Sequence, residues 1–112
     1  MQMEILDTGR NVTHVKLLGS MDANGAYENI LRFENVVTSA REHALVDMSE
    51  LSFISSIGMS AFVESAKALR RTAHKLVLYA LQPNVKTALL TAGLDKLMVL
   101  ADDMQQAQDV LA

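Results

Sequence analysis

Two adjacent serines, Ser55 and Ser56, occupy the position in this sequence where residue type and spacing best suit chemistry. They follow an apolar run and come just before a helical pattern, so they fall where a helix begins. Backbone N–H groups at a helix start lack partners within the helix, and the helix dipole is positive there, so a phosphate on either hydroxyl would be accommodated. It would place about −1.5 to −2 charges beside the apolar Ile57. The sequence therefore offers a phosphorylation switch, and the alternative is a serine that only caps the helix, which contributes about 1 kcal/mol.

The other reactive residue types do not assemble into a catalytic or metal site. Asp47 ends a predicted strand, as the phosphoacceptor of a receiver domain would, but the early strand lacks the paired acids that would hold its magnesium ion. A turn or cap role therefore suits Asp47 better. None of the three histidines has metal-ligand spacing with another, and the two serines lie in no nucleophile-elbow pattern. We expect a protein that is not an enzyme and that uses no metal and no cofactor.

The serine pair is expected between a buried strand and a helix. Residues 44–48 form a short, continuous apolar run, as in a strand covered on both faces. The helix should continue to about Arg71, because Arg70 and Arg71 suit its negative C-terminal end. Its buried stripe is predicted to be Met59, Phe62, Val63, Ala66 and Leu69. The opposite, exposed face is predicted to carry Ile57, Ala61 and Glu64.

The first part of the chain predicts a hairpin followed by a helix. Residues 3–6 and 12–18 are strand candidates, and residues 7–11 between them carry turn chemistry. His14 is expected on the solvent side of the second strand, because the other face is the cleanly apolar one. Residues 19–25 break the pattern, and they offer Asp22 or Asn24 as a helix N-cap. The helix should run to about Arg41, with an inner stripe of Ala26, Ile30, Phe33, Val37 and Ala40.

The last third of the chain predicts two further strand and helix pairs. Residues 75–81 indicate a buried strand, and Pro83 suits the first position of a third helix that Gly93 would terminate. Residues 97–100 indicate a fifth strand, and Asp102 and Asp103 suit the start of a last helix. The inward-facing residues are expected to be Val85, Ala88, Leu89 and Ala92 in the third helix and Met104, Ala107, Val110 and Leu111 in the last.

The predicted order of elements is β-β-α-β-α-β-α-β-α within one domain, residues 1–112. A chain of 112 residues, half of them apolar, suffices for one compact core but hardly for two. Helices that alternate with buried strands predict an α/β fold with a mostly parallel central sheet, an N-terminal antiparallel hairpin and about four helices. In such open sheets, sites gather where strands end and helices begin. We therefore expect residues 22–25 and 55–58, which both follow strands, at one functional edge.

Composition excludes several classes of protein. The formal net charge is −3, basic residues do not cluster, and only three phenylalanines and two tyrosines are present, so direct binding to nucleic acid is not expected. The absence of cysteine excludes a disulfide framework. No apolar run approaches the ~20 residues that a membrane span needs, and the first residues do not form a signal peptide. We expect a soluble, cytoplasmic protein without membrane insertion.

Two separated stretches resemble one known family. Residues 47–59 (DMSELSFISSIGM) and residues 19–23 (GSMDA) are similar to the STAS domain, and specifically to bacterial anti-sigma factor antagonists. The resemblance implies that a partner anti-sigma factor, itself a serine kinase, phosphorylates Ser56, with Ser55 as the alternative acceptor. It also implies that a PP2C-type phosphatase reverses the modification. The partner-binding residues would be Asp22, Ala23, Asn24, Ser55, Ser56, Ile57, Gly58, Ser60, Ala61 and Glu64.

Two functions from different classes follow from this resemblance. In the first, the unphosphorylated chain binds a kinase-type anti-sigma factor and frees its sigma factor, and serine phosphorylation switches it off. In the second, the chain is an unmodified STAS adaptor in a transporter or a larger signalling assembly. The second stays open because the family usually has aspartate where this chain has Ser55, and often a second serine where it has Ile57.

Overall fold

The central sheet contains five strands in sequence order, β1-β2-β3-β4-β5, in the computed structural model of this chain. The structure describes residues 1–6, 11–22 and 27–111. β1 (Gln2–Leu6) pairs antiparallel with β2 (Val12–Met21). β3 (His43–Ile54), β4 (Leu76–Tyr79) and β5 (Val99–Ala101) follow, each parallel to its neighbour. The predicted hairpin and mostly parallel sheet are confirmed.

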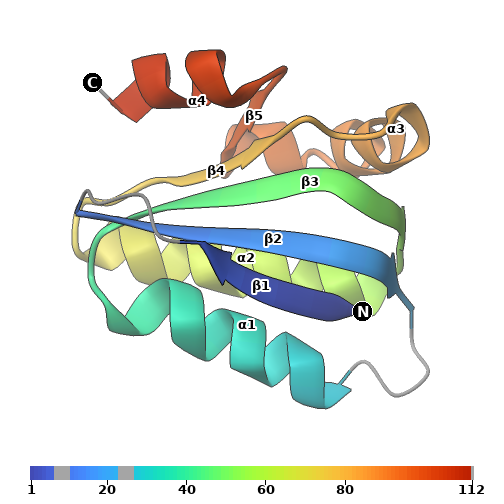
Figure 1. Ribbon diagram of the computed structural model, residues 1–112, viewed down its shortest axis with the longest axis horizontal. Coiled ribbons are helices and arrows are strands. Elements are labelled where there is room, and N and C mark those ends of the chain that lie inside the picture. Colours follow the sequence, from blue (N-terminus) through green and yellow to red (C-terminus); the bar gives the residue numbers. More distant parts are fainter. Residues whose placement is uncertain (7–10, 23–26, 112) are drawn as a thin grey trace.

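Four α-helices alternate with these strands in the predicted order. They are α1 (Tyr27–Ser39), α2 (Ser56–Arg71), α3 (Pro83–Thr91) and α4 (Met104–Leu111), and a short 3-10 helix, η1 (Leu94–Lys96), precedes β5. In Figure 1, α1 and α2 lie side by side below the sheet and α4 lies above it. α3 packs against β3 and η1. The α/β architecture that the sequence predicts is therefore confirmed.

The larger of two hydrophobic clusters joins the sheet to α1, α2 and α3. Phe33 of α1 and Phe62 of α2 are fully buried and meet edge to face with their ring centroids 5.3 Å apart, an arrangement that aromatic rings favour. The predicted inner positions that are buried in these helices are Ile30, Phe33, Val37, Phe62, Ala66, Leu69, Val85 and Leu89. The helical phase read from the sequence is thus correct along most of α1, α2 and α3.

A second, smaller cluster lies between the sheet and α4. β4 contributes to both clusters, because Leu76 and Leu78 face the larger one while Val77 and Tyr79 face the smaller one. All four residues of β4 are buried, as expected for a strand covered on both faces. The buried members of the smaller cluster are Leu45, Val77, Tyr79, Ala101 and Ala107.

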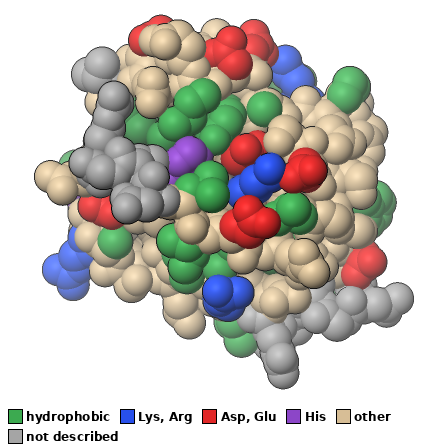
Figure 2. Space-filling model, in the orientation of Figure 1, with side chains coloured by type: hydrophobic (Ala, Val, Ile, Leu, Met, Phe, Trp, Pro, Cys, Tyr) green, Lys and Arg blue, Asp and Glu red, His purple; other side chains and the backbone are tan. Residues whose placement is uncertain are grey.

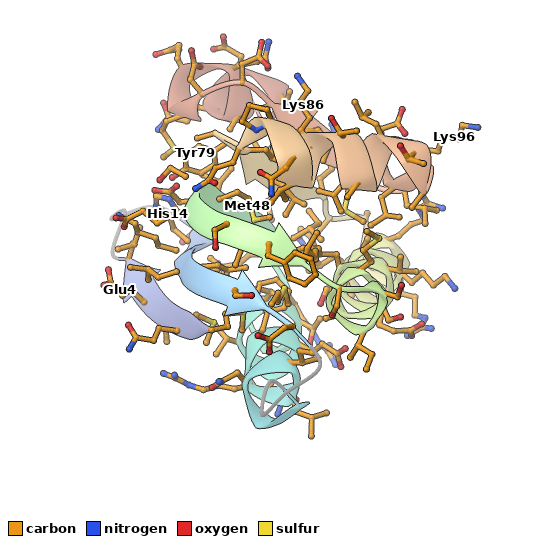
Figure 3. The ribbon with its side chains drawn as sticks, turned by 90° about the vertical axis from the view of Figure 1, so that its right-hand side faces the viewer. Glu4, His14, Met48, Tyr79, Lys86 and Lys96 are labelled. Atoms are coloured by element: carbon orange, nitrogen blue, oxygen red, sulfur yellow. The ribbon has the colours of Figure 1, made fainter. Side chains whose placement is uncertain are left out.

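The prediction that His14 lies on the solvent side is wrong. The side chain is only 8% exposed, and its Nε2 lies 2.6 Å from the hydroxyl oxygen of Tyr79. β3 separates the strands that carry these two residues, so Tyr79 reaches across β3 to cover the histidine (Figure 3). Burial lowers the pKa of His14, and the negative charge of Asp47, which raises that pKa, offsets the shift only in part. A neutral imidazole nitrogen can accept the tyrosine O–H, which satisfies both polar groups.

The two strands that lead to the serine turn are longer than the sequence predicts. β2 continues to Met21, although a break was expected from Gly19, and β3 continues to Ile54. The pairing of these strands shifts register between Lys16 and Leu18 and again between Gly19 and Ser20. Such bulges preserve the pairing while they interrupt the alternation of apolar residues. Because the alternation is interrupted, the apolar pattern of the sequence predicts that β2 and β3 end earlier than they do.

The remaining differences concern element ends. Ala40 and Ala92 were expected to face inward, but both are exposed, because α1 ends at Ser39 and α3 ends at Thr91. β4 is shorter than the predicted residues 75–81, and β5 starts later than residue 97 because η1 precedes it. Pro83 does begin α3, and Gly93 follows the helix with a φ of 78°, in the left-handed region that glycine adopts easily. Ala26 lies outside the described residues.

Candidate partner-docking site

Ser55 is held in place between β3 and α2. Its side-chain oxygen accepts a hydrogen bond from the backbone N–H of Gly58 at 3.2 Å, so Ser55 is the N-cap of α2. Its own N–H donates to the carbonyl oxygen of Met21 at 2.8 Å, and its carbonyl oxygen accepts from the N–H of Met59 at 2.9 Å. Both its backbone groups and its hydroxyl are therefore engaged in fixing the turn, and the residue is half-buried.

Ser56 is the first residue of α2, and it is exposed. Its carbonyl oxygen accepts a hydrogen bond from the hydroxyl of Ser60 at 3.1 Å. Its own hydroxyl has no hydrogen-bond partner among the residues that the structure describes. The hydroxyl of Ser56 is thus open to a reacting enzyme, whereas that of Ser55 caps the helix.

Two exposed apolar side chains flank this turn. Phe53 is 49% exposed at the end of β3, and Ile57 is 46% exposed in the first turn of α2. Figure 3 looks at the edge of the molecule where β3 ends and α2 begins. Exposed large apolar residues around one polar group are typical of a surface that a partner covers. These two side chains come three residues before Ser56 and one residue after it, and a docked protein that covers Ser56 could bury them.

Sequence reasoning missed Phe53 as a candidate contact residue. The second register shift between β2 and β3 lies between the pairs Gly19 with Leu51 and Ser20 with Phe53. Side chains alternate between the two faces of a regular strand, but a register shift interrupts this alternation, so the sequence does not show which face a residue after the shift occupies. The available signal was the aromatic type of Phe53 together with its place two residues before the serine pair.

Four further predicted site residues on α2 differ in their environments. Ala61 is only 1% exposed, so its expected place on the exposed face is wrong. The buried arc of α2 is wide, because the helix packs against α1 as well as against the sheet. Gly58 is buried too, and a Cβ there would lie 3.0 Å from Cγ1 of Ile54 and 3.1 Å from Sδ of Met21. Ser60 and Glu64 are exposed, as the prediction requires.

The end of β2 lies beside the serine turn. The backbone hydrogen bond from Ser55 to Met21 joins the two segments, so Asp22 follows β2 at the same edge of the sheet. Asp22 is half-buried, and one of its carboxylate oxygens lies 3.5 Å from the hydroxyl of Ser20. The candidates Ala23 and Asn24 lie outside the described residues. The prediction that residues 22–25 and 55–58 share one edge is confirmed for Asp22, and residues 23–25 lie outside the described ranges.

Charge around the site is modest. The carboxyl group of Glu34 on α1 has a raised pKa because of burial and because Glu64 on α2 repels its charged form. On the face seen in Figure 2, acidic and basic side chains are interspersed, and Lys16 pairs with Glu50 at 2.7 Å. Asp47 accepts a hydrogen bond from the N–H of Ser49 at 2.9 Å, but it lies within β3, so its predicted place in a turn at the end of a strand is wrong.

The described residues contain no cluster that could hold a metal ion. Residues 1–6, 11–22 and 27–111 hold no group of three or more histidine and carboxylate side chains close enough together to bind one. No helix within those ranges has the length and apolar character needed to cross a membrane.

Comparison with protein families identifies the domain. A family model of the STAS domain matches residues 5–107, which is most of the chain. The chain belongs to the STAS domain family. The match begins within β1 and ends within α4, so it includes β2, β3, β4, β5 and the serine turn.

Solved structures share the fold of this STAS domain. The anti-sigma factor antagonist SpoIIAA in its unphosphorylated form has a TM-score of 0.78 and 17% sequence identity, with 98% of this chain and 96% of that chain covered. The Bacillus SpoIIAA in its phosphorylated form has a TM-score of 0.67 and 18% identity, with 99% and 100% covered. TM1081 of Thermotoga maritima, assigned as an anti-sigma factor antagonist, has a TM-score of 0.72 and 18% identity, with 96% and 91% covered.

Proposed function

We propose that this STAS domain is an anti-sigma factor antagonist whose unphosphorylated form binds a kinase-type anti-sigma factor and thereby releases a sigma factor. The observation that carries the proposal is the exposed Ser56 together with the exposed side chains of Phe53 and Ile57, which flank it in the sequence. Its fold is that of SpoIIAA, which has been solved in both an unphosphorylated and a phosphorylated form. The function proposed here is binding, not catalysis, and its setting is the cytoplasm.

Phosphorylation of Ser56 would switch off binding through charge. The phosphate adds about −1.5 to −2 charges to a surface that includes Phe53 and Ile57, and a partner that covers this surface would have to desolvate them. Reversing a two-state equilibrium from 1:99 to 99:1 takes ~5.5 kcal/mol, and an unpaired, desolvated charge costs several kcal/mol. One phosphate is thus sufficient in magnitude to act as the switch.

The domain itself would tolerate the modification. Ser56 is the first residue of a sixteen-residue helix, so a phosphate there lies near unpaired N–H groups and the positive end of the dipole. Ser56 also lies outside both hydrophobic clusters. The effect would therefore fall on the partner, and a PP2C-type phosphatase would restore the binding form without any need to refold the domain.

An unmodified adaptor is the second candidate function. The specific observation in its favour is Ser55, which replaces the family's usual aspartate and whose hydroxyl is occupied in capping α2. A serine at that position supplies the cap without the negative charge of an aspartate. In this case the same surface would hold a transporter subunit or a signalling assembly together permanently.

The surface is tested by placing a charge on it. Ile57→Asp should weaken binding to the cognate kinase-type anti-sigma factor by about tenfold or more, since a carboxylate left unpaired in an interface costs at least 1–3 kcal/mol. The matched control is Leu90→Asp on α3, because Leu90 is 45% exposed and Ile57 is 46% exposed. Calorimetric titration gives the affinities, and thermal unfolding should be nearly unchanged in both variants. An unaltered affinity for Ile57→Asp would remove this surface from the proposal.

A further inference from the structure

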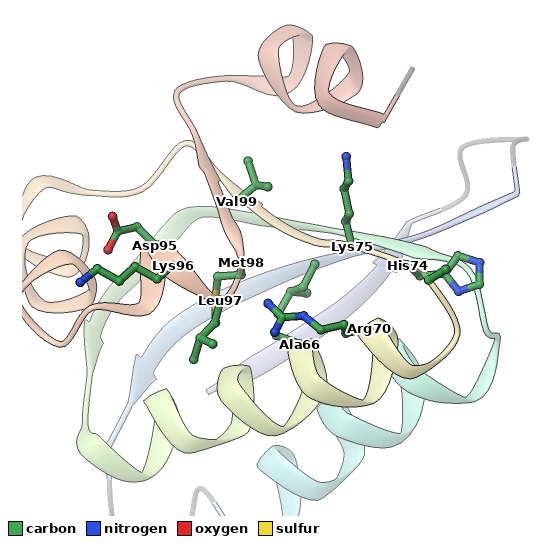
Figure 4. A pocket seen from close by; sticks show the side chains of 11 residues that line it. Ala66, Arg70, His74, Lys75, Asp95, Lys96, Leu97, Met98 and Val99 are labelled. Carbon is green, nitrogen blue, oxygen red and sulfur yellow. The ribbon is translucent and has the colours of Figure 1, made fainter.

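A groove of about 430 Å³ lies between the second half of α2 and the segment that contains η1 and β5. α1 and α2 pack side by side, and β5 is a short strand at the edge of the sheet, so the strip beside β5 is not covered by α2 (Figure 4). The volume lies within the ~300–1,000 Å³ that small-molecule sites occupy. It is large enough for a ligand of modest size.

The floor of the groove is aliphatic. Ala66 of α2, Leu76 of β4 and Met98 are almost fully buried, and Leu97 beside them is half-buried. Methionine and leucine side chains adapt to an alkyl chain. No phenylalanine, tyrosine or tryptophan lines the groove among the described residues, and the ring of His74, which does line it, already meets the ring of His43 and the hydroxyl of Thr72. The floor therefore fits a saturated chain better than a nucleobase.

The rim of the groove is positively charged although the chain as a whole carries a charge of −3. Arg70, Lys75 and Lys96 line it, against the single carboxylate of Asp95. Figure 4 shows the guanidinium of Arg70 extending over the groove. Lys75 is turned toward α4, where its amine lies 3.4 Å from the carbonyl oxygen of Val110. Arg70 is thus the cation best placed to meet a ligand.

The guanidinium of Arg70 is not needed within the domain. In residues 1–6, 11–22 and 27–111, no ion pair involves it. The C-terminal carbonyl groups of α2 that it could neutralise are already satisfied: that of Arg70 accepts from the N–H of Ala73 at 3.0 Å, and that of Leu69 accepts from the N–H of His74 at 2.9 Å. An arginine can bind a carboxylate through two parallel hydrogen bonds.

We propose that this groove binds a small aliphatic carboxylate, with its carboxylate on Arg70 and its alkyl chain on Ala66, Leu97 and Met98. The combination of a single available guanidinium and an aliphatic floor selects a ligand that has both a negative head and a saturated tail. The site is at the opposite end of α2 from Ser56, so it does not depend on the proposed phosphorylation switch.

Octanoate is a suitable probe for this site. We expect octanoate, titrated into the full chain, to shift the amide NMR signals of the groove-lining residues in a saturable way. Octylamine has the same tail with a positive head, and acetate has the same head without the tail. Both should bind at least about tenfold more weakly, because each lacks one of the two recognised groups. If octylamine or acetate binds as well as octanoate, the proposal is overturned.

The neighbouring arginines provide a matched pair of variants. Arg70→Gln should weaken octanoate binding about tenfold or more, as expected for loss of a charge-assisted hydrogen bond. Arg71→Gln should bind as the wild type does, because Arg71 is exposed and does not line the groove. Both residues are exposed, so neither substitution should unfold the chain, and amide spectra check this directly. The proposed site would be contradicted if the two substitutions weakened octanoate binding equally. It would also be contradicted if octanoate bound without shifting the amide signals of the groove-lining residues.

Discussion

The two hydrophobic clusters of this domain differ in what they contain. The larger one, which joins the sheet to α1, α2 and α3, is almost entirely apolar and is centred on the aromatic pair Phe33 and Phe62. The smaller one, under α4, adjoins a buried polar pair in which Tyr79 covers His14. The first should provide stability that depends little on pH, whereas the second should make stability sensitive to the protonation of a histidine.

The proposed switch lies outside both clusters. Ser56 is exposed at the edge of the sheet where β3 ends, while Ser55 beside it is tied into the backbone. A charge added at Ser56 therefore changes a surface and not a core. This separation allows a modification to control binding without unfolding the domain, and the predictions below test it by perturbing each region in turn.

The largest effect is expected in the apolar cluster. Phe62→Ala should lower the free energy of unfolding by ~3–5 kcal/mol, because the residue is fully buried against Phe33 and its removal leaves a cavity. The total stability of a domain is typically ~5–15 kcal/mol, so the loss would be severe. Denaturant unfolding measures it, with exposed Leu90→Ala as the control. A loss below ~1 kcal/mol would mean that the cluster is not centred on this aromatic pair.

An intermediate effect is expected in the polar pair. Tyr79→Phe removes the hydroxyl that meets Nε2 of His14, so a buried nitrogen loses its partner at a cost of about 1–3 kcal/mol. Denaturant unfolding above pH 6.5, where the imidazole is neutral, isolates this loss. Unchanged stability would indicate that water replaces the tyrosine hydroxyl and that the hydrogen bond between His14 and Tyr79 does not stabilise the fold.

The dependence of stability on pH provides a second measurement on the same pair. Burial lowers the pKa of His14 below its ordinary value of 6.5, so the unfolded chain binds a proton more readily than the folded one. The stabilising contribution is therefore fully present above pH 6.5 and is lost as pH falls through the lowered pKa. His43 acts in the same direction, because burial and then the charges of His74 and Lys75 lower its pKa. In His14→Gln the free energy of unfolding should depend less steeply on pH than in the wild type. An equally steep dependence would mean that groups other than His14 cause it.

The smallest effect should distinguish the two serines. Ser55→Ala removes the N-cap of α2 and should cost about 1 kcal/mol of unfolding free energy. Ser56→Ala should change the free energy of unfolding by less than ~0.5 kcal/mol, because the hydroxyl that it removes is exposed and makes no hydrogen bond within the described residues. Denaturant unfolding of both variants checks the difference. A larger loss of stability in Ser56→Ala than in Ser55→Ala would mean that Ser56 caps the helix and that Ser55 has the accessible hydroxyl.

The sequence predicted what regular periodicity can encode. The element order and the buried faces of α1 and α2 follow from apolar spacing, and residues such as Phe33 and Phe62 were placed correctly. The errors occur where a tertiary contact overrides a local pattern. His14 alternates with apolar neighbours as a surface residue would, but a tyrosine from β4, 65 positions along the chain, covers it. Ala61 is buried because α1 packs beside α2, which periodicity within one helix cannot reveal.

Part of the candidate site was likewise predictable. The small residues of the serine turn indicated a helix start, and Ser56 was placed on its exposed side. The contribution of Phe53 depends on bulges between β2 and β3, which pair residues distant in sequence, so its exposure required the structure.

Peptide-resolved mass spectrometry after reaction with the cognate kinase and ATP shows whether Ser56 is the phosphorylated residue. We expect one phosphate, on Ser56, and we expect Ser55→Ala to accept it as well. Ser56→Ala should accept none and remain a binder that cannot be turned off, while Ser56→Asp should bind more weakly, although a carboxylate carries less charge than a phosphate. Phosphate on Ser55 alone would contradict the assignment, and phosphate on neither serine would favour the adaptor.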